Sequence, residues 1–268
     1  MRRILVIIIP LVLIIAVVFL VLKMSSHTMP QQLKGGSVPS LLSQAKDLEA
    51  QGKILEAKNV YVKLIGDFSS SRDMSSWQKK VEELNIKLLF SPEIIPRTTA
   101  YEIKPGDTLS KIAKEFKTTP DLIIKSNNLA NDLIIPGKKL KVWTVRFTIM
   151  VDKSQNVLLL KTEDEILKTY TVSTGLNNST PVGTFKIINK LQNPTWFKAG
   201  AVVAPGSAEN VLGTRWLGFN IPGYGIHGTV EPEKLGQQVT QGCVRMLNTD
   251  VEELYTIVPV DTEVTIVD

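Results

Sequence analysis

The chain has 268 residues, of which 43% are hydrophobic and 21% are charged, and its formal net charge is +5. This length allows one or two domains with a substantial core beyond any leader, and the scattered basic residues form neither the arginine-rich run nor the base-stacking aromatic set typical of nucleic-acid binding. A single cysteine, Cys243, excludes an intramolecular disulfide framework.

Residues 4–22 form a nearly unbroken apolar run, with Arg2 and Arg3 before it and Lys23 after it. About 20 such residues cross the hydrocarbon core of a membrane as a helix. The arginines favour a cytoplasmic N-terminus, which places the rest of the chain on the outer face of the cell membrane. The alternative is a cleaved signal peptide, whose apolar region is normally about 7–15 residues long. We therefore expect a retained transmembrane signal-anchor at 4–22, followed by a polar linker at 23–39.

Residues 40–90 carry apolar side chains at helical spacing. Gly52 and the serines at 69–71 interrupt this pattern, so it predicts three amphipathic helices. The first two resemble a tetratricopeptide-type hairpin, but only one unit is visible, whereas such arrays usually need about three units for stability. Two interpretations stay open: a helical spacer or small packing module, and a protein-binding surface.

Residues 100–143 form a compact unit with the predicted order strand, turn, helix, helix, turn, strand. Pro105-Gly106 predicts a turn, and Asp107 or Thr108 is placed to cap the helix that follows. The Pro-Gly-Asp-Thr-Leu segment at 105–109 and the Ile-Pro-Gly-x-x-Leu segment at 135–140 resemble the LysM domain, a family that binds glycans containing N-acetylglucosamine, including peptidoglycan. The resemblance implies that glycan contacts come from the loops at 106–108 and 129–133.

From residue 145 the hydrophobic period changes to two, which is typical of strands. The predicted strands are 145–151, 157–161, 166–173, 185–188 and 263–267, and 250–257 is a predicted helix. A strand-rich, glycine-dotted sequence with few helices predicts a mainly β domain over 145–268, either a β-sandwich or an open barrel.

Cys243 lies sixteen positions after His227, and both have glycines beside them. A thiolate is a strong nucleophile, and an imidazole can take the thiol proton. The alternative is a buried structural cysteine with an incidental histidine, since free cysteine is among the most buried residue types.

The sequences around this pair occur in a specific order: Ile-His-Gly-Thr at 226–229, then Thr-Gln-Gly-Cys-Val-Arg-Met at 240–246, with Thr-Pro-Val-Gly-Thr-Phe upstream at 180–185. Together they resemble the signature of the L,D-transpeptidases with a YkuD-type catalytic domain, which remodel peptidoglycan with a cysteine nucleophile. One departure is Gln241, where many members carry a second histidine.

The resemblance implies acyl transfer. Cys243 attacks the carbonyl of the third residue of a peptidoglycan stem peptide, D-alanine leaves, and a side-chain amine of a second stem attacks the thioester. His227 acts as general base and then as general acid. The backbone N–H groups of Gly242 and Cys243 are candidates for an oxyanion hole. No cofactor and no metal ion are expected, because neither a second histidine nor a further cysteine accompanies His227.

Four residues are expected to bind substrate: Arg245, Gly242, Thr240 and Gly228. Arg245 either holds a donor carboxylate or carbonyl or pairs with Asp250, since a guanidinium fork suits both partners. Thr240 orients the histidine or the loop. The aromatic side chains that are candidates to line the cleft are Trp196, Phe197, Trp216 and Tyr224.

The predicted fold class is therefore multidomain, with a mainly β catalytic domain, a small α+β LysM module, a helical region and one transmembrane helix. The expected partners are peptidoglycan stem peptides and glycan strands, the membrane through the N-terminal helix, and carbapenem-type inhibitors, but no nucleic acid. The predicted function is a membrane-anchored peptidoglycan L,D-transpeptidase with an extracytoplasmic catalytic domain. The alternatives are an L,D-carboxypeptidase that uses water as acceptor and a non-catalytic peptidoglycan-binding scaffold.

Overall fold

The computed structural model describes residues 36–198 and 200–268. The predicted anchor at 4–22 and most of the predicted linker at 23–39 lie outside these ranges. Within them, no helix combines the length and the apolar character that a membrane crossing requires.

Three helices form the N-terminal layer: α2 (Val38–Ala50), α3 (Ile54–Asp67) and α4 (Met74–Leu89). Their apolar faces share a core of their own that includes Leu41, Val60, Leu64 and Trp77, all almost fully buried. The sequence pattern thus identified three helices in the right places, because each helix presents one apolar stripe to its neighbours.

The next unit has the predicted order, with β1 (Thr98–Glu102), α5 (Leu109–Phe116), α6 (Pro120–Ser126) and β2 (Lys139–Trp143). β1 and β2 pair antiparallel. The hydroxyl of Thr108 accepts a hydrogen bond from the N–H of Lys111 at 3.2 Å, so Thr108 caps α5. Asp107 instead accepts hydrogen bonds from the Tyr101 hydroxyl and the Lys104 N–H, which fixes the preceding turn.

The remaining residues build a mixed sheet with the strand order β13-β11-β10-β7-β14-β3-β4-β5. Its strands are β3 (Thr148–Asp152), β4 (Val157–Lys161), β5 (Ile166–Thr171), β7 (Gly183–Gln192), β10 (Arg215–Phe219), β11 (Gly225–His227), β13 (Val244–Arg245) and β14 (Glu263–Val267). Only β14–β3 and β11–β13 are parallel pairs in this sheet. β3 begins at Thr148, three residues after the start of the predicted strand at 145–151, because residues 144–147 form the connection from β2.

The sheet curls until its two ends meet. Ser173, just after β5, exchanges two backbone hydrogen bonds with Arg245 in β13. The predicted β-sandwich or open barrel is thus an eight-stranded curled sheet whose ends are joined by a single bridge. Helix α7 (Asn248–Ile257) packs its buried side chains Val251, Leu254 and Ile257 into the core of this sheet.

Short elements border the curled sheet. They are β6 (Thr174–Gly175), the 3-10 turn η1 (Leu176–Asn178), the hairpin of β8 (Trp196–Lys198) and β9 (Ala201–Val203), the 3-10 turn η2 (Pro232–Lys234) and β12 (Gln238–Thr240). β12 pairs with β6 in parallel, and this pair leads directly into the segment that carries Cys243.

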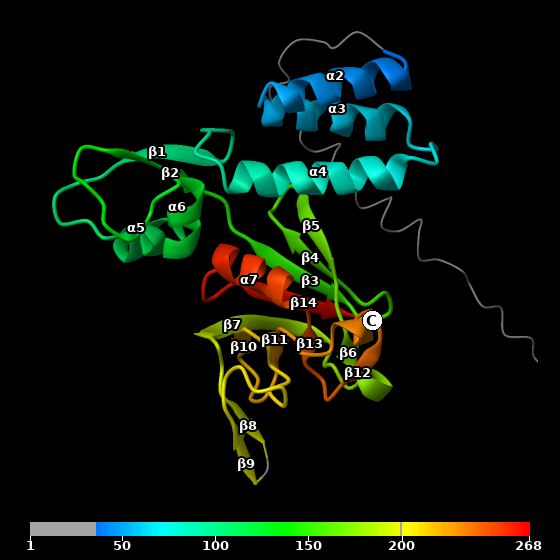
Figure 1. Ribbon diagram of the computed structural model, residues 1–268, viewed down its shortest axis with the longest axis vertical. Helices are drawn as coiled ribbons and strands as arrows, with labels where there is room; N and C mark the ends of the chain where they lie inside the picture. Colours follow the sequence, from blue (N-terminus) through cyan, green and yellow to red (C-terminus); the bar gives the residue numbers. More distant parts are fainter. Residues whose placement is uncertain (1–35, 199) are drawn as a thin grey trace, which may run out of the picture.

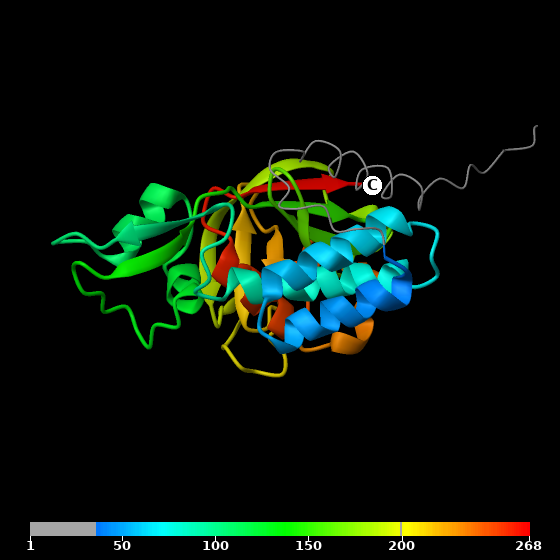
Figure 2. The same ribbon diagram turned by 90° about the horizontal axis from the view of Figure 1, so that it is seen from above.

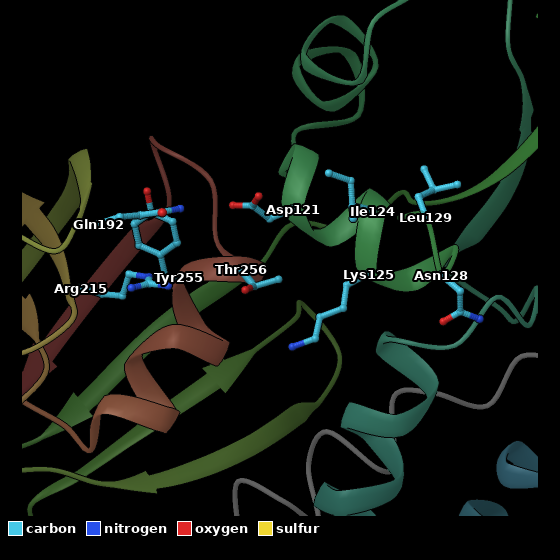
Figure 3. A pocket seen from close by; sticks show the side chains of 9 residues that line it. All are labelled: Asp121, Ile124, Lys125, Asn128, Leu129, Gln192, Arg215, Tyr255 and Thr256. Carbon is cyan, nitrogen blue, oxygen red and sulfur yellow. The ribbon is translucent and has the colours of Figure 1, made fainter. Parts of the chain in front are cut away.

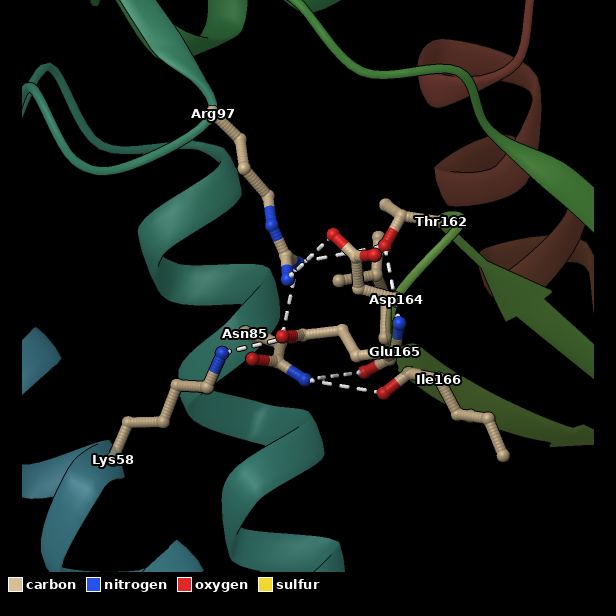
Figure 4. Close-up of polar contacts among 8 residues, drawn as sticks. Lys58, Asn85, Arg97, Thr162, Asp164, Glu165 and Ile166 are labelled. Carbon is tan, nitrogen blue, oxygen red and sulfur yellow. Dashed lines mark hydrogen bonds and ion pairs between the residues drawn. The ribbon is translucent and has the colours of Figure 1, made fainter. Parts of the chain in front are cut away.

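The helical layer is joined to the edge strand β5, as Figures 1 and 2 show. Asn85 on α4 donates to the backbone carbonyl of Leu167 at 3.0 Å. Glu165, just before β5, accepts from Lys58 at 2.8 Å and from Arg97 at 3.0 Å (Figure 4). These contacts occupy an edge that would otherwise present unpaired backbone groups.

Candidate active site

The predicted base lies on β11, and the predicted nucleophile directly precedes the neighbouring strand β13. β11 and β13 run parallel, with Ile226 opposite Val244 and His227 opposite Arg245. Ile226 and Val244 are fully buried in the core, and side chains alternate across a strand. His227 and Arg245 therefore lie on the face away from that core, and Cys243, two residues before Arg245, approaches the same face.

Trp216 covers this face from the next strand. It pairs with His227 across β10 and β11, and the two rings stack with centroids 6.1 Å apart and an interplanar angle of 20°. A Cβ added to Gly225 would lie 2.9 Å from the Trp216 ring. A side chain at position 225 would therefore force the indole off the histidine.

The buried ring of His227 has a fixed tautomer. Only 3% of the residue is exposed, and Nδ1 lies 2.7 Å from the carbonyl oxygen of Gly228. Because a carbonyl only accepts hydrogen bonds, Nδ1 carries the proton and Nε2 keeps its lone pair. Burial lowers the pKa of His227 to about 4; the bond to Gly228 opposes this shift and the charge of Arg245 adds to it. At neutral pH the ring is an uncharged proton acceptor.

The thiol of Cys243 is held by the loop before β11. Sγ donates to the carbonyl of Gly223 at 3.4 Å. Burial raises the pKa of the thiol above its ordinary value, while the backbone of Gly225 and the charge of Arg245 act in the opposite direction. The resting pair is therefore a neutral thiol and a neutral imidazole, not a thiolate–imidazolium ion pair.

Thr240 holds the turn that presents Cys243. Its hydroxyl donates to the carbonyl of Cys243 at 2.6 Å and accepts from the N–H of Gly242 at 3.2 Å. Gly242 has φ +122°, and a Cβ there would lie 2.6 Å from Cε1 of Tyr224. Glycine is thus required at 242 by both the backbone conformation and the close approach of the tyrosine ring. Of the two alternatives for Thr240, the structure shows contacts with the loop.

Arg245 forms an ion pair, but not with Asp250, which was one of the two alternatives that the sequence left open. Its Nη1 lies 3.0 Å from Oε2 of Glu231, just before η2, so the structural pairing with Asp250 that the sequence suggested is wrong. The carboxylate of Glu231 is bound by Lys234 as well, and the bond to Lys234 is the leading cause that lowers the pKa of Glu231. Nε of Arg245 is buried and has no hydrogen-bond partner among the described residues.

Asn248 is a residue whose role the sequence did not show. Its Oδ1 accepts from the N–H groups of Thr229 at 3.0 Å and Thr214 at 3.2 Å, and its Nδ2 donates to the carbonyl of Thr229 at 2.8 Å. Asn248 therefore fixes the loop that follows His227 to the start of α7. In the sequence, Asn248 follows the Cys243 segment as part of the family resemblance, but the pattern assigned it no role.

A groove of about 320 Å³ adjoins the site. Trp216 and Tyr224 line it, as does Gly223, whose carbonyl accepts from the thiol. Trp196 and Phe197 belong instead to β8, in a separate hairpin where Phe197 is 75% exposed. Among the residues that the structure describes, no three His, Cys, Asp or Glu side chains gather as a set of metal ligands.

Comparison with known proteins identifies the same two families that the sequence motifs resemble. Residues 146–266 match the L,D-transpeptidase catalytic domain of the YkuD family, and residues 101–143 match the LysM domain. A relative named as the L,D-transpeptidase YkuD of Bacillus licheniformis is 35% identical over 175 residues, which cover 62% of this chain and 97% of the relative. Its counterpart in Bacillus subtilis is 34% identical over 174 residues, with the same coverage.

Among solved structures, an L,D-transpeptidase from Mycobacterium tuberculosis has a TM-score of 0.41 at 16% identity, over 50% of this chain and 63% of that one. The match to the Bacillus relatives spans nearly their whole length. The chain therefore belongs to the YkuD-type L,D-transpeptidases and carries a LysM domain ahead of its catalytic domain.

Proposed function

We propose that this enzyme forms peptide cross-links in peptidoglycan by acyl transfer through Cys243. The observation that carries the proposal is the placement of Cys243 directly before β13, the strand that pairs with the one carrying His227, with Nε2 of the histidine left as a proton acceptor. A nucleophile beside a base whose tautomer is fixed by a third group is the arrangement that covalent catalysis requires.

In the first step, a bond forms between Sγ and the carbonyl carbon of the third stem residue. His227 takes the thiol proton as this bond forms, because the pKa of the imidazole lies below that of the thiol and a free thiolate is not the resting state. The C–N bond to D-alanine then breaks, and the imidazolium returns the proton to the departing amine. The product is a thioester on Cys243.

In the second step, the side-chain amine of another stem attacks the thioester. His227 takes a proton from this amine and returns it to the sulfur as the thioester C–S bond breaks. The amide that forms joins the two stems, and the enzyme regains its starting protonation state. If water attacks instead, the same steps release a shortened stem, so only the acceptor separates transpeptidation from carboxypeptidation.

The turn at 240–243 supplies the oxyanion site in this proposal. The N–H of Gly242 already donates to Thr240, so the N–H of Cys243 is the principal donor to the developing charge. Thr240 and Gly228 act by positioning, since one holds the turn and the other fixes the histidine tautomer. Arg245, on the same face as His227, attracts the donor stem while Glu231 holds one end of its guanidinium.

We further propose that the catalytic domain is extracytoplasmic, anchored in the cell membrane by residues 4–22 and held on the wall polymer by the LysM domain. The length of the apolar run and its flanking arginines support the anchor. Holding an enzyme on an insoluble polymer raises the local substrate concentration without touching the reacting atoms.

A carbapenem tests the nucleophile directly. The wild-type protein is expected to gain one carbapenem-derived adduct, located on Cys243 by peptide mapping, and Cys243→Ala is expected to gain none. An adduct on another residue would contradict the assignment. Digestion of cell walls from strains with and without the protein, followed by mass spectrometry, separates the outcomes, since cross-links between the third residues of two stems require an amine acceptor and shortened stems require water.

A further inference from the structure

A second groove, of about 450 Å³, lies between the LysM unit and the catalytic domain. Figure 3 shows side chains from both domains around it, with Asp121, Lys125 and Asn128 on the LysM side and Gln192 and Arg215 on the catalytic side. Thr256 at the end of α7 lies between the two sides. The groove is distinct from the one beside Trp216, because Arg215 and Trp216 alternate on β10 and point to opposite faces of the sheet.

Three charged groups of this groove have hydrogen-bonding capacity to spare. Neither Asp121 nor Lys125 takes part in an ion pair within the described ranges, although the charge of Asp121 opposes the burial that lowers the pKa of Lys190. Nζ of Lys125 lies over the Phe90 ring, at 4.2 Å from its centroid. Arg215 donates Nη1 to the carbonyl of Thr214 at 2.8 Å, and its carboxylate neighbour Glu252 is 3.8 Å away. The groove thus offers hydrogen-bond donors, on Lys125 and Arg215, and a hydrogen-bond acceptor, on Asp121, that can still bind a ligand.

Neutral groups extend this mixed character. Asn128 and Gln192 are exposed amides on opposite sides, and each carries both a donor and an acceptor. Tyr255 contributes a half-buried ring, against which Nζ of Lys190 lies at 4.1 Å from the centroid. Ile124 and Leu129 add apolar surface. A ligand that fits must present both hydrogen-bond donors and hydrogen-bond acceptors, such as hydroxyl or amide groups, and also apolar C–H faces.

We propose that this groove binds the glycan strand of peptidoglycan through N-acetylhexosamine units that contact both domains at once. Sugar hydroxyls donate and accept, so they suit a carboxylate, two amides and two cations together. An acetamido group matches the side-chain amides. This inference rests on the proposed function, because it assigns a place to the polymer that carries the stem peptides.

The junction keeps this groove in a fixed position relative to the thiol. Thr119, the cap of α6, donates its hydroxyl to the carbonyl of Thr256 on α7. Trp216 follows Arg215 on β10 and stacks on His227. Sugars held in the groove would therefore place a stem peptide at a set distance along the strand from Cys243, which makes the LysM domain part of substrate alignment as well as of tethering.

The test measures binding of soluble N-acetylglucosamine oligomers of increasing length to the full-length protein by calorimetry. Gln192→Ala on the catalytic side and Asn128→Gly on the LysM side are each expected to weaken binding of the hexamer about threefold to tenfold, the loss expected for one or two hydrogen bonds. Glycine is chosen at 128 because Asn128 has φ +52°. Gln155→Ala, an exposed amide at the β3–β4 turn, is the matched control and should bind like the wild type.

Wild-type affinity for the hexamer after Gln192→Ala would overturn the proposal, since the catalytic side would then make no contact with the glycan. Tighter binding of stem peptide than of oligomer in this groove would overturn it as well. Carbapenem acylation of Cys243, measured on the same proteins, should be equal in all of them. If the wild type itself shows no adduct, the proposed function fails, and the binding result stands or falls separately.

Discussion

Asn248 and Thr229 are joined by two hydrogen bonds of opposite direction: the N–H of Thr229 donates to Oδ1 of Asn248 at 3.0 Å, and Nδ2 of Asn248 donates to the carbonyl of Thr229 at 2.8 Å. Both strands beside the proposed site depend on this pair, because Thr229 follows β11, which carries His227, and Asn248 begins the helix that follows β13.

Asn248→Ala is expected to lower the free energy of unfolding by about 2–4 kcal/mol, because three hydrogen bonds are lost and the N–H of Thr214 is among the groups left without a partner. The rate of carbapenem acylation should fall as well, since the loop after His227 is released. Asn248→Asp keeps the acceptor but cannot donate to Thr229, so urea unfolding should place it between the wild type and the alanine variant. Equal stability of all three proteins would show that the pair does not hold the loop.

Thr240→Val tests the turn that presents the thiol. It keeps the shape of the side chain but removes the hydroxyl that contacts both Gly242 and Cys243. We expect acylation by a carbapenem to slow about tenfold to a hundredfold, because the turn loosens while the oxyanion-hole donor itself stays; outright loss of such a donor costs about a hundredfold to a thousandfold. Thr240→Ser retains the hydroxyl and is expected to stay within a few-fold of the wild type in stopped-flow measurements. If acylation is also slow in Thr240→Ser, the methyl group of Thr240, and not its hydroxyl, holds the turn.

His227 should make folding stability depend on pH in the acid range. Its pKa is about 4 in the folded protein and 6.5 in the unfolded chain, so between these values the unfolded state binds a proton that the folded state does not. The contribution of His227 to stability is therefore fully present above pH 6.5 and is lost as the pH falls towards 4, by about 3 kcal/mol.

His227→Gln is the reference for this measurement, because it has no titrating ring and shares every other group with the wild type. The difference in free energy of unfolding between the two proteins should shrink between pH 7 and pH 4. A constant difference would mean that the imidazole is not buried in its neutral form. Acylation at neutral pH should be much slower in the variant, with partial recovery at high pH where hydroxide produces thiolate.

Glu165→Gln should loosen the helical layer from the catalytic domain. Glu165 bridges Lys58 and Arg97, with all three side chains between 16% and 26% exposed. Removing this charge is expected to cost about 1 kcal/mol, and less at high salt. Hydrogen exchange in α3 and α4 should report the change. Glu163→Gln, two positions earlier and without an ion pair among the described residues, should leave exchange unaltered. If the exchange rates in α3 and α4 rise equally in the Glu163→Gln variant, the effect comes from net charge and not from the ion pairs of Glu165.

The sequence by itself determined the local elements of this protein. The three N-terminal helices, the strand–helix–helix–strand unit and the strands at 157–161 and 263–267 follow from the periodicity of their apolar residues, which is a property of neighbouring positions. It also determined the family, because the order of residues around His227 and Cys243 is specific enough to be matched along the chain.

Only the tertiary structure decided which residues meet. The partner of Arg245 is Glu231 and not Asp250, because the loop that leads into η2 brings the Glu231 carboxylate to within 3.0 Å of Nη1. The carbonyl that orients His227, the hold of Asn248 on Thr229 and the groove shared by two domains are likewise contacts that no periodicity encodes. The physical reason is that a spacing pattern fixes the face on which a side chain lies, whereas its partners depend on how distant segments pack.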